Sequence, residues 1–125
     1  MRWATKIAAV QQIPIEESRL AVYGTLRPGQ PNHHVLAEIP GRWLEGHVHG
    51  RLVEEGWGAA LGSPGIVLDH GAPAVKVWVL ESADLPSHWS RLDGFEGLGY
   101  SRIPVIVRVP NGELSAFIYA LTSLP

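Results

Sequence analysis

The C-terminal part of the chain contains the feature that most constrains its fold, two β-prone segments joined by a tight turn. The run IPVIVRV (103–109) precedes Pro110-Asn111-Gly112, and the run ELSAFIYAL (113–121) follows it. Asn-Gly tolerates the positive φ angles that a tight hairpin turn requires. The sequence therefore predicts a long β-hairpin over residues 103–121.

Further strands are predicted upstream, where short apolar or alternating runs end at glycine-containing turns. They cover residues 19–24, 41–56, 65–69 and 74–80. A single helical turn is predicted at Val35–Ile39, because Pro40 and Gly41 follow it. A chain of 125 residues, 46% of them hydrophobic and with 14 Gly and 10 Pro, is typical of one turn-rich globular domain.

Charge and cysteine content exclude several classes of function. The net charge of −2 provides no basic surface for nucleic acid. Without cysteine the chain has no disulfide framework and no thiol nucleophile, and nothing indicates an oxidising compartment, so we expect a cytoplasmic protein. The apolar run Ile7–Val10 is too short for a signal-peptide core or a membrane span.

One helix is clearly patterned, within residues 83–97. Leu85, Trp89, Leu92 and Glu96 follow one another at intervals of four, three and four, which places them on one stripe of a helix. Ser82 or Asp84 can cap its N-terminus, with Pro86 in the first turn, and Gly97 can end it. A glutamate thus stands at the C-terminal end of an otherwise apolar stripe.

Glu96 is the candidate general acid/base. Burial and the partial negative charge of a helix C-terminus both disfavour a carboxylate, so its pKa is expected to rise towards neutrality. The alternative is a frayed helix end whose glutamate points into water. Asp93 lies on the flank of the stripe and Glu81 precedes the helix, so we interpret both as solvated.

The stretch VYGTLRPGQPN (22–32) is a candidate anion site. A strand that ends in glycine can direct consecutive N–H groups of Tyr23 to Leu26 into one concavity, with Arg27 adding charge. The alternative is an ordinary turn, because no phosphate or dinucleotide fingerprint is present. A rival chemistry comes from His47 and His49, which share a strand face, with His33 and His34 as further metal ligands. We interpret this histidine pair as a surface or hydrogen-bonded pair.

Together these residues resemble the γ-glutamylcyclotransferase-like family, which includes γ-glutamylamine cyclotransferases and small AIG2-like bacterial relatives. The resemblance extends from about Leu20 to Leu121. Its motifs are Tyr23-Gly24-Thr25-Leu26-Arg27 with Gly29 and Asn32-His33, then Leu92-Asp93-x-Phe95-Glu96-Gly97-x-x-Tyr100-x-Arg102, then Ala116-x-x-Tyr119.

The resemblance implies an α+β fold, a small mixed barrel-like sheet with one or two helices packed against it. It also implies a γ-glutamyl cyclotransferase, an enzyme of acyltransferase or lyase type in which the substrate's α-amine attacks its own γ-carbonyl and releases 5-oxoproline with an amine or amino acid. Glu96 would be the general acid/base, and substrate would bind at Tyr23, Gly24, Thr25, Leu26, Arg27 and either Tyr100 or Tyr119. No metal or cofactor is implied, and the expected partner is a small γ-glutamyl substrate.

Several alternatives stay open. Residues 1–18 form an N-terminal extension to a domain at 19–125, and this extension is either an added strand or a contact for a homodimer. The leaving group can be an amino acid, an amine, a peptide or glutathione. The rival functions are a non-catalytic binding protein for carboxylates or γ-glutamyl compounds on the same fold, and a metal-dependent protein using His47 and His49.

Overall fold

The computed structural model describes residues 15–24, 28–30, 33–53, 65–97 and 99–121. Residues 1–14 of the predicted extension lie outside this range. The elements, in chain order, are η1 (Ile15–Ser18), β1 (Arg19–Val22), α2 (His34–Ala37), β2 (Arg42–Val53), β3 (Gly65–Leu68), β4 (Ala74–Glu81), η3 (Leu85–Ser87), α3 (Trp89–Glu96), β5 (Tyr100–Val109) and β6 (Gly112–Leu121). Among the described residues, no helix is long and apolar enough to cross a membrane.

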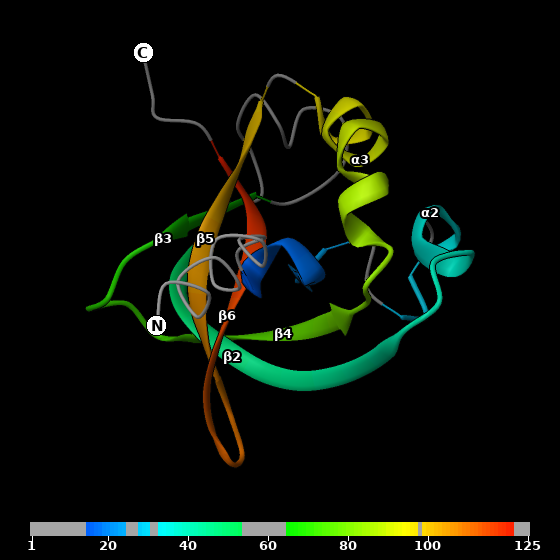
Figure 1. Ribbon diagram of the computed structural model, residues 1–125. Helices are drawn as coiled ribbons and strands as arrows, with labels where there is room; N and C mark the ends of the chain where they lie inside the picture. The colour runs from blue at the N-terminus through cyan, green and yellow to red at the C-terminus, as the bar shows by residue number, and fades with distance from the viewer. Residues whose placement is uncertain (1–14, 25–27, 31–32, 54–64, 98, 122–125) are drawn as a thin grey trace, which may run out of the picture.

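In the part of the chain that the structure describes, five strands close into a barrel, and a sixth, β3, extends from its side (Figure 1). The strand order is β3-β2-β4-β1-β6-β5, and β2 also pairs with β5 at His47 and Arg108, which closes the barrel. All pairs are antiparallel except β1 with β6. The predicted α+β class, a barrel-like sheet with helices against it, is confirmed.

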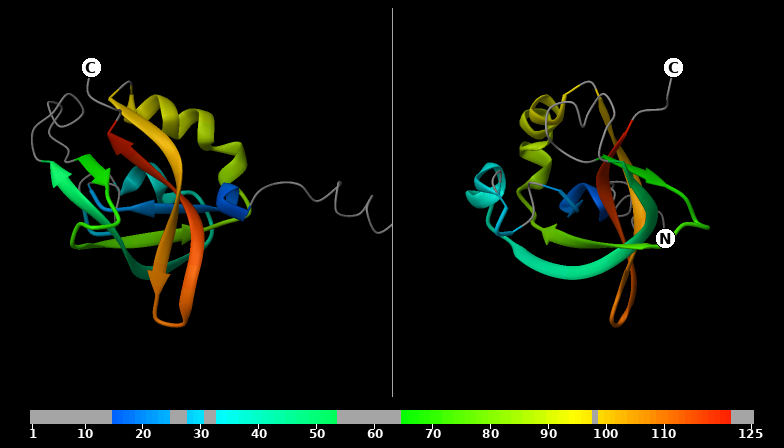
Figure 2. Two further views of the ribbon diagram at one scale, coloured as in Figure 1. Left: turned by 90° about the vertical axis from the view of Figure 1, so that its left-hand side faces the viewer. Right: turned by 180° about the vertical axis from the view of Figure 1, so that it is seen from behind.

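The predicted C-terminal hairpin is confirmed. Its last paired residues are Val109 and Gly112, so Pro110 and Asn111 form a two-residue turn, and Gly112 has a φ of 141° that favours glycine. Figure 2 shows β5 and β6 as a long twisted ribbon whose tip projects away from the end of the barrel that carries α3.

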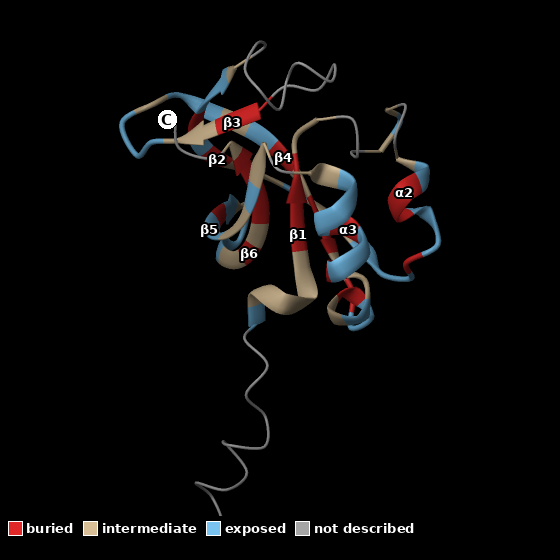
Figure 3. Cartoon of the chain, turned by 90° about the horizontal axis from the view of Figure 1, so that it is seen from above, coloured by how far each residue is buried: buried red, intermediate tan, exposed pale blue. Residues whose placement is uncertain are grey.

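Two apolar cores lie on opposite faces of the wall formed by β4, β1 and β6. Alternate residues of β1 show this directly, because Ala21 packs in one core while Leu20 and Val22 pack in the other. The barrel core contains small and β-branched residues, such as Val77 and Ile118. The second core lies between the outside of the wall and the helices α2 and α3, whose buried residues are red in Figure 3.

The predicted helix forms as two consecutive pieces. The 3₁₀ segment η3 ends at Ser87, and His88, with a φ of −108°, separates it from α3. The apolar stripe is nevertheless right, since Leu85, Trp89 and Leu92 are buried. Ser82, one of the two predicted caps, uses its hydroxyl to accept the N–H of Asp84 at 3.1 Å.

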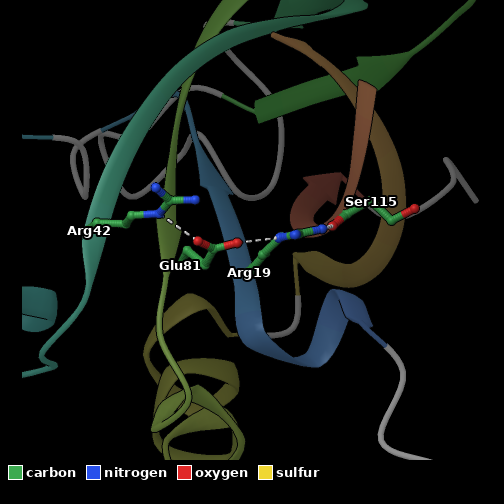
Figure 4. A network of polar contacts seen from close by, with 4 residues as sticks. All are labelled: Arg19, Arg42, Glu81 and Ser115. Atoms are coloured by element: carbon green, nitrogen blue, oxygen red, sulfur yellow. Dashed lines mark hydrogen bonds and ion pairs between the residues drawn. The ribbon is translucent and has the colours of Figure 1, made fainter. Parts of the chain in front are cut away.

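The interpretation of Glu81 as solvated is wrong. In β4 it lies opposite Arg19 of β1 and Arg42 of β2. Its carboxylate accepts hydrogen bonds from Arg42 Nε at 2.6 Å and Arg19 Nε at 2.9 Å, and Arg19 also donates to Ser115 O of β6 (Figure 4). These arginines, Arg42 foremost, lower the pKa of Glu81. The network connects four strands at one end of the barrel.

Replacing Glu81→Gln is expected to lower the free energy of unfolding at neutral pH by about 1–2 kcal/mol, because Arg19, only 18% exposed, loses its counter-charge. A depressed pKa contributes stability above the ordinary value of 4.5, and that contribution is lost as pH falls through the folded-state pKa. Urea unfolding of both proteins should therefore give a difference that shrinks below about pH 4.5.

The matched control is Glu45→Gln. Glu45 pairs with Lys76 at 2.9 Å, but the two side chains are 65% and 56% exposed. A pair of this kind contributes about 0.5 kcal/mol or less. Equal losses in the two variants would contradict a structural role for the Glu81 network.

Candidate active site

Glu96 is the last residue of α3, and Gly97 ends the helix with a φ of 82°. The N–H of Gly97 bonds to the carbonyl of Asp93 at 3.0 Å, which closes the last turn. Glu96 is half-buried, and burial raises the pKa of its carboxyl from the ordinary 4.5 to about 7. A carboxyl with such a pKa both accepts and donates a proton readily near neutral pH.

Three tyrosines that are distant in sequence share the surroundings of Glu96. They are Tyr23, which follows β1, Tyr100 at the start of β5, and Tyr119 near the end of β6. Burial is the main cause that raises the pKa of each phenol, and the charge of Glu96 raises it further in all three. Glu96 therefore lies within electrostatic range of side chains that are distant in sequence, at the end of the barrel where β1 and β6 end and β5 begins.

The hydroxyl of Tyr23 is held by backbone groups of two strands. It donates to Tyr119 O at 2.6 Å and accepts the N–H of Ile66 at 3.1 Å. Tyr23, which the sequence predicts to contact substrate, thus also joins the end of β1 to β6 and β3. Gly24 is described, whereas Thr25, Leu26 and Arg27 of the predicted nest lie outside the described residues. The anion nest stays a prediction.

Asp93 forms a second polar cluster on α3: it is exposed to solvent, as interpreted, but its carboxylate is also paired. Its carboxylate accepts Arg102 Nε at 2.8 Å, Arg102 Nη2 at 3.2 Å and the Tyr119 hydroxyl at 2.6 Å. The Arg102 guanidinium, foremost, holds the pKa of Asp93 below its usual value. Sequence spacing gave no signal of this cluster, because it depends on the pairing of β5 with β6, which sets Arg102 opposite Tyr119.

The histidines of the metal hypothesis lie elsewhere. His47 and His49 on β2 have ring centroids 5.5 Å apart and line a groove of about 640 Å³ that also includes Arg108 of β5. His49 Nδ1 lies 2.8 Å from Ala72 O, and His33 lies against Trp43 instead. In the described part of the chain, no three metal-ligating side chains lie close enough together to hold an ion.

Comparison with protein families gives one match, to the family described as gamma-glutamyl cyclotransferase, AIG2-like, over residues 20–124. That range includes Glu96, Asp93 and the three tyrosines. No curated protein matches the chain.

Solved structures with the same fold come from bacteria, animals and archaea. YkqA from Bacillus subtilis is 32% identical, with a TM-score of 0.65, over 84% of this chain and 36% of that one, so this chain spans well under half of YkqA. An AIG2-like protein from Mus musculus is 26% identical over 86% and 79% of the two chains, with a TM-score of 0.66.

An uncharacterised protein from Pyrococcus horikoshii is 28% identical over 86% and 80% of the two chains, with a TM-score of 0.58. The family match covers most of the sequence, and the barrel with α3 against it has the fold of the solved AIG2-like protein. The chain therefore belongs to the AIG2-like γ-glutamyl cyclotransferase family.

Proposed function

We propose that the protein is a γ-glutamyl cyclotransferase that releases 5-oxoproline from a small γ-glutamyl compound, with Glu96 as the general acid/base. The observation that carries this proposal is the burial of Glu96, which raises its pKa to about 7 beside Tyr23, Tyr100 and Tyr119. Membership of the family supports the reaction type. The leaving group is the part of the proposal that experiment must identify.

The chemistry needs one proton acceptor that becomes a proton donor. The substrate's α-amine is an ammonium near neutral pH, so ionised Glu96 takes one of its protons and frees the nitrogen lone pair. That nitrogen attacks the γ-carbonyl carbon, and the new C–N bond closes a five-membered ring. The protonated Glu96 then gives its proton to the leaving nitrogen as the original amide C–N bond breaks, and the carboxylate is restored. The ring nitrogen loses its second proton to the released amine, so the products are 5-oxoproline, whose lactam nitrogen keeps one hydrogen, and the amine as an ammonium ion.

Most of the remaining acceleration comes from positioning. Amine and carbonyl belong to one molecule, so holding the substrate folded gives the attack a high effective molarity. Backbone N–H groups of the Tyr23–Leu26 turn are proposed to hold the substrate's carboxylate or polarise the reacting carbonyl, with Arg27 adding positive charge. Tyr100 and Tyr119 are both proposed for the pocket wall, and the hydroxyl of Tyr119 also donates to Asp93.

A panel of substrates tests the proposal. γ-Glutamyl amino acids, γ-glutamyl amines and glutathione are each incubated with catalytic amounts of protein, and 5-oxoproline is measured over many turnovers. Release from at least one class supports the proposal and identifies the leaving group. Calorimetric binding of 5-oxoproline or a γ-glutamyl compound without turnover of any of them would favour the non-catalytic binding protein instead.

A further inference from the structure

Asp93 holds the last turn of α3 in two ways. Its backbone carbonyl accepts the N–H of Gly97, which closes the turn that contains Glu96. Its carboxylate binds Arg102 of β5 and the hydroxyl of Tyr119 of β6. Asp93 and Glu96 are three residues apart, less than one turn of an α-helix, so movement of one displaces the other.

The two anchors of the Asp93 carboxylate are themselves fixed. Arg102 and Tyr119 are directly paired across β5 and β6, so they form one platform. The Arg102 guanidinium lies 4.5 Å from the ring centroid of Trp89 and 4.6 Å from that of Phe117. Tyr119 is only 4% exposed. A guanidinium beside two rings and a carboxylate has little freedom to move.

We propose that Asp93 is a positioning residue for Glu96: through Arg102 and Tyr119 it fixes the end of α3 against the β5–β6 ribbon and thereby sets how deeply the Glu96 carboxyl is buried. The inference rests on the proposed role of Glu96. A displacement of about 1 Å at a reacting group lowers rates by about 10²-fold, so loss of this contact affects catalysis without touching substrate.

The first test is Asp93→Asn. Among the described residues, the ionisable or charged groups around Glu96 are Tyr23 just after β1, Tyr100 from β5 and Tyr119 from β6, with the Asp93–Arg102 pair close by on α3 and β5. The variant is expected to lower kcat at least about tenfold with little change in KM, since it loosens the acid/base and not the substrate contacts. Thermal unfolding by circular dichroism verifies that the variant is folded at the assay temperature.

A second readout needs no substrate. A ¹³C NMR titration of the Glu96 carboxyl carbon should give a pKa of about 7 in the wild type. In Asp93→Asn the pKa of Glu96 should be about 6 or below, because water reaches the carboxyl. An inactive wild-type protein would rule out the proposed catalytic function. The NMR titration would still decide whether Asp93 positions Glu96.

Arg102→Gln distinguishes position from charge. If the pair acted through charge alone, removing Arg102 would leave Asp93 as an uncompensated anion and raise the pKa of Glu96. If Asp93 acts by positioning, Arg102→Gln should instead lower the pKa of Glu96, as Asp93→Asn does. Tyr119→Phe removes one anchor and no charge, so a smaller decrease in the same direction is expected.

Asp84→Asn is the matched control, because Asp84 is exposed, precedes η3 and makes no side-chain capping bond. It should leave kcat and the Glu96 titration unchanged. A Glu96 titration that is unchanged in Asp93→Asn, or one that rises in Arg102→Gln, would overturn the positioning role.

Discussion

Glu96→Gln is expected to lower kcat/KM for the γ-glutamyl substrate by about 10²–10⁴-fold, the usual contribution of a general acid/base. Glutamine keeps the size of the side chain and its place at the end of α3, but it neither takes a proton from the substrate's ammonium nor returns one to the leaving nitrogen. The measurement is the initial rate of 5-oxoproline release under pseudo-first-order conditions, where kcat/KM is read directly.

The same variant should be more stable than the wild type above neutral pH. The folded-state pKa of Glu96 is raised from 4.5 to about 7, so the folded state binds its proton more tightly than the unfolded chain, and stability is lost as pH rises through about 7. This difference between the folded-state and unfolded-state pKa values corresponds to a destabilisation of the fold on the order of 3 kcal/mol when Glu96 is ionised. Glutamine is never ionised, so urea unfolding at about pH 8 should show the gain.

Glu38→Gln is the control for both measurements, because Glu38 is an exposed carboxylate at the end of α2. It should change neither rate nor stability beyond a few tenths of a kcal/mol. Full turnover in Glu96→Gln would rule out the general acid/base role. A loss of stability in that variant at about pH 8 would show that the carboxylate is stabilised in the fold, which contradicts the raised pKa.

Gly46→Ala is expected to destabilise the barrel by about 1–3 kcal/mol or more. Gly46 lies on β2 where β5 crosses to close the barrel, next to the pair His47 and Arg108. A Cβ added there would lie 2.5 Å from the carbonyl oxygen of Arg108 and 2.7 Å from Cγ1 of Val107. The first of these is a backbone atom, so the strands must separate at the closure.

Gly94→Ala makes the same chemical change but is expected to stabilise the protein. Gly94 lies in α3, its φ is not positive, and an added Cβ would meet nothing within 4 Å. Alanine in a helix interior is favoured over glycine by about 1 kcal/mol, so this variant should unfold at higher urea concentration. Equal stability of the two variants would show that the close approach of β2 and β5 does not limit the fold.

Local pattern was enough to predict most elements. The Asn-Gly turn predicted the β5–β6 hairpin, and the Leu85, Trp89 and Leu92 stripe predicted the buried face of α3. The closure of the barrel was implied by family resemblance alone, because pairing of β2 with β5, and parallel pairing of β1 with β6, join segments that are far apart in the chain. Such pairings leave no periodic signal in either strand.

The polar contacts around the site show the same limit. Glu96 was identifiable because an acid interrupts an apolar stripe, a signal that lies within one helix. Asp93 lies on the flank of the stripe and Glu81 precedes the helix, so spacing alone suggested solvent, whereas their arginine partners come from other strands. The second function of Tyr23, holding β3 and β6 through its hydroxyl, likewise depends on tertiary contacts.

The most direct test of the central claim compares two curves on the wild-type protein. One is the pH dependence of kcat for the best γ-glutamyl substrate between about pH 5 and 8, and the other is the ¹³C NMR titration of Glu96 with that substrate's unreactive analogue bound. Because Glu96 must be ionised to take the ammonium proton, kcat should fall as pH decreases below about 7, and its midpoint should coincide with the Glu96 titration. A kcat that does not change across this range, or a midpoint separate from the Glu96 titration, would contradict the assignment of Glu96 as the catalytic acid/base.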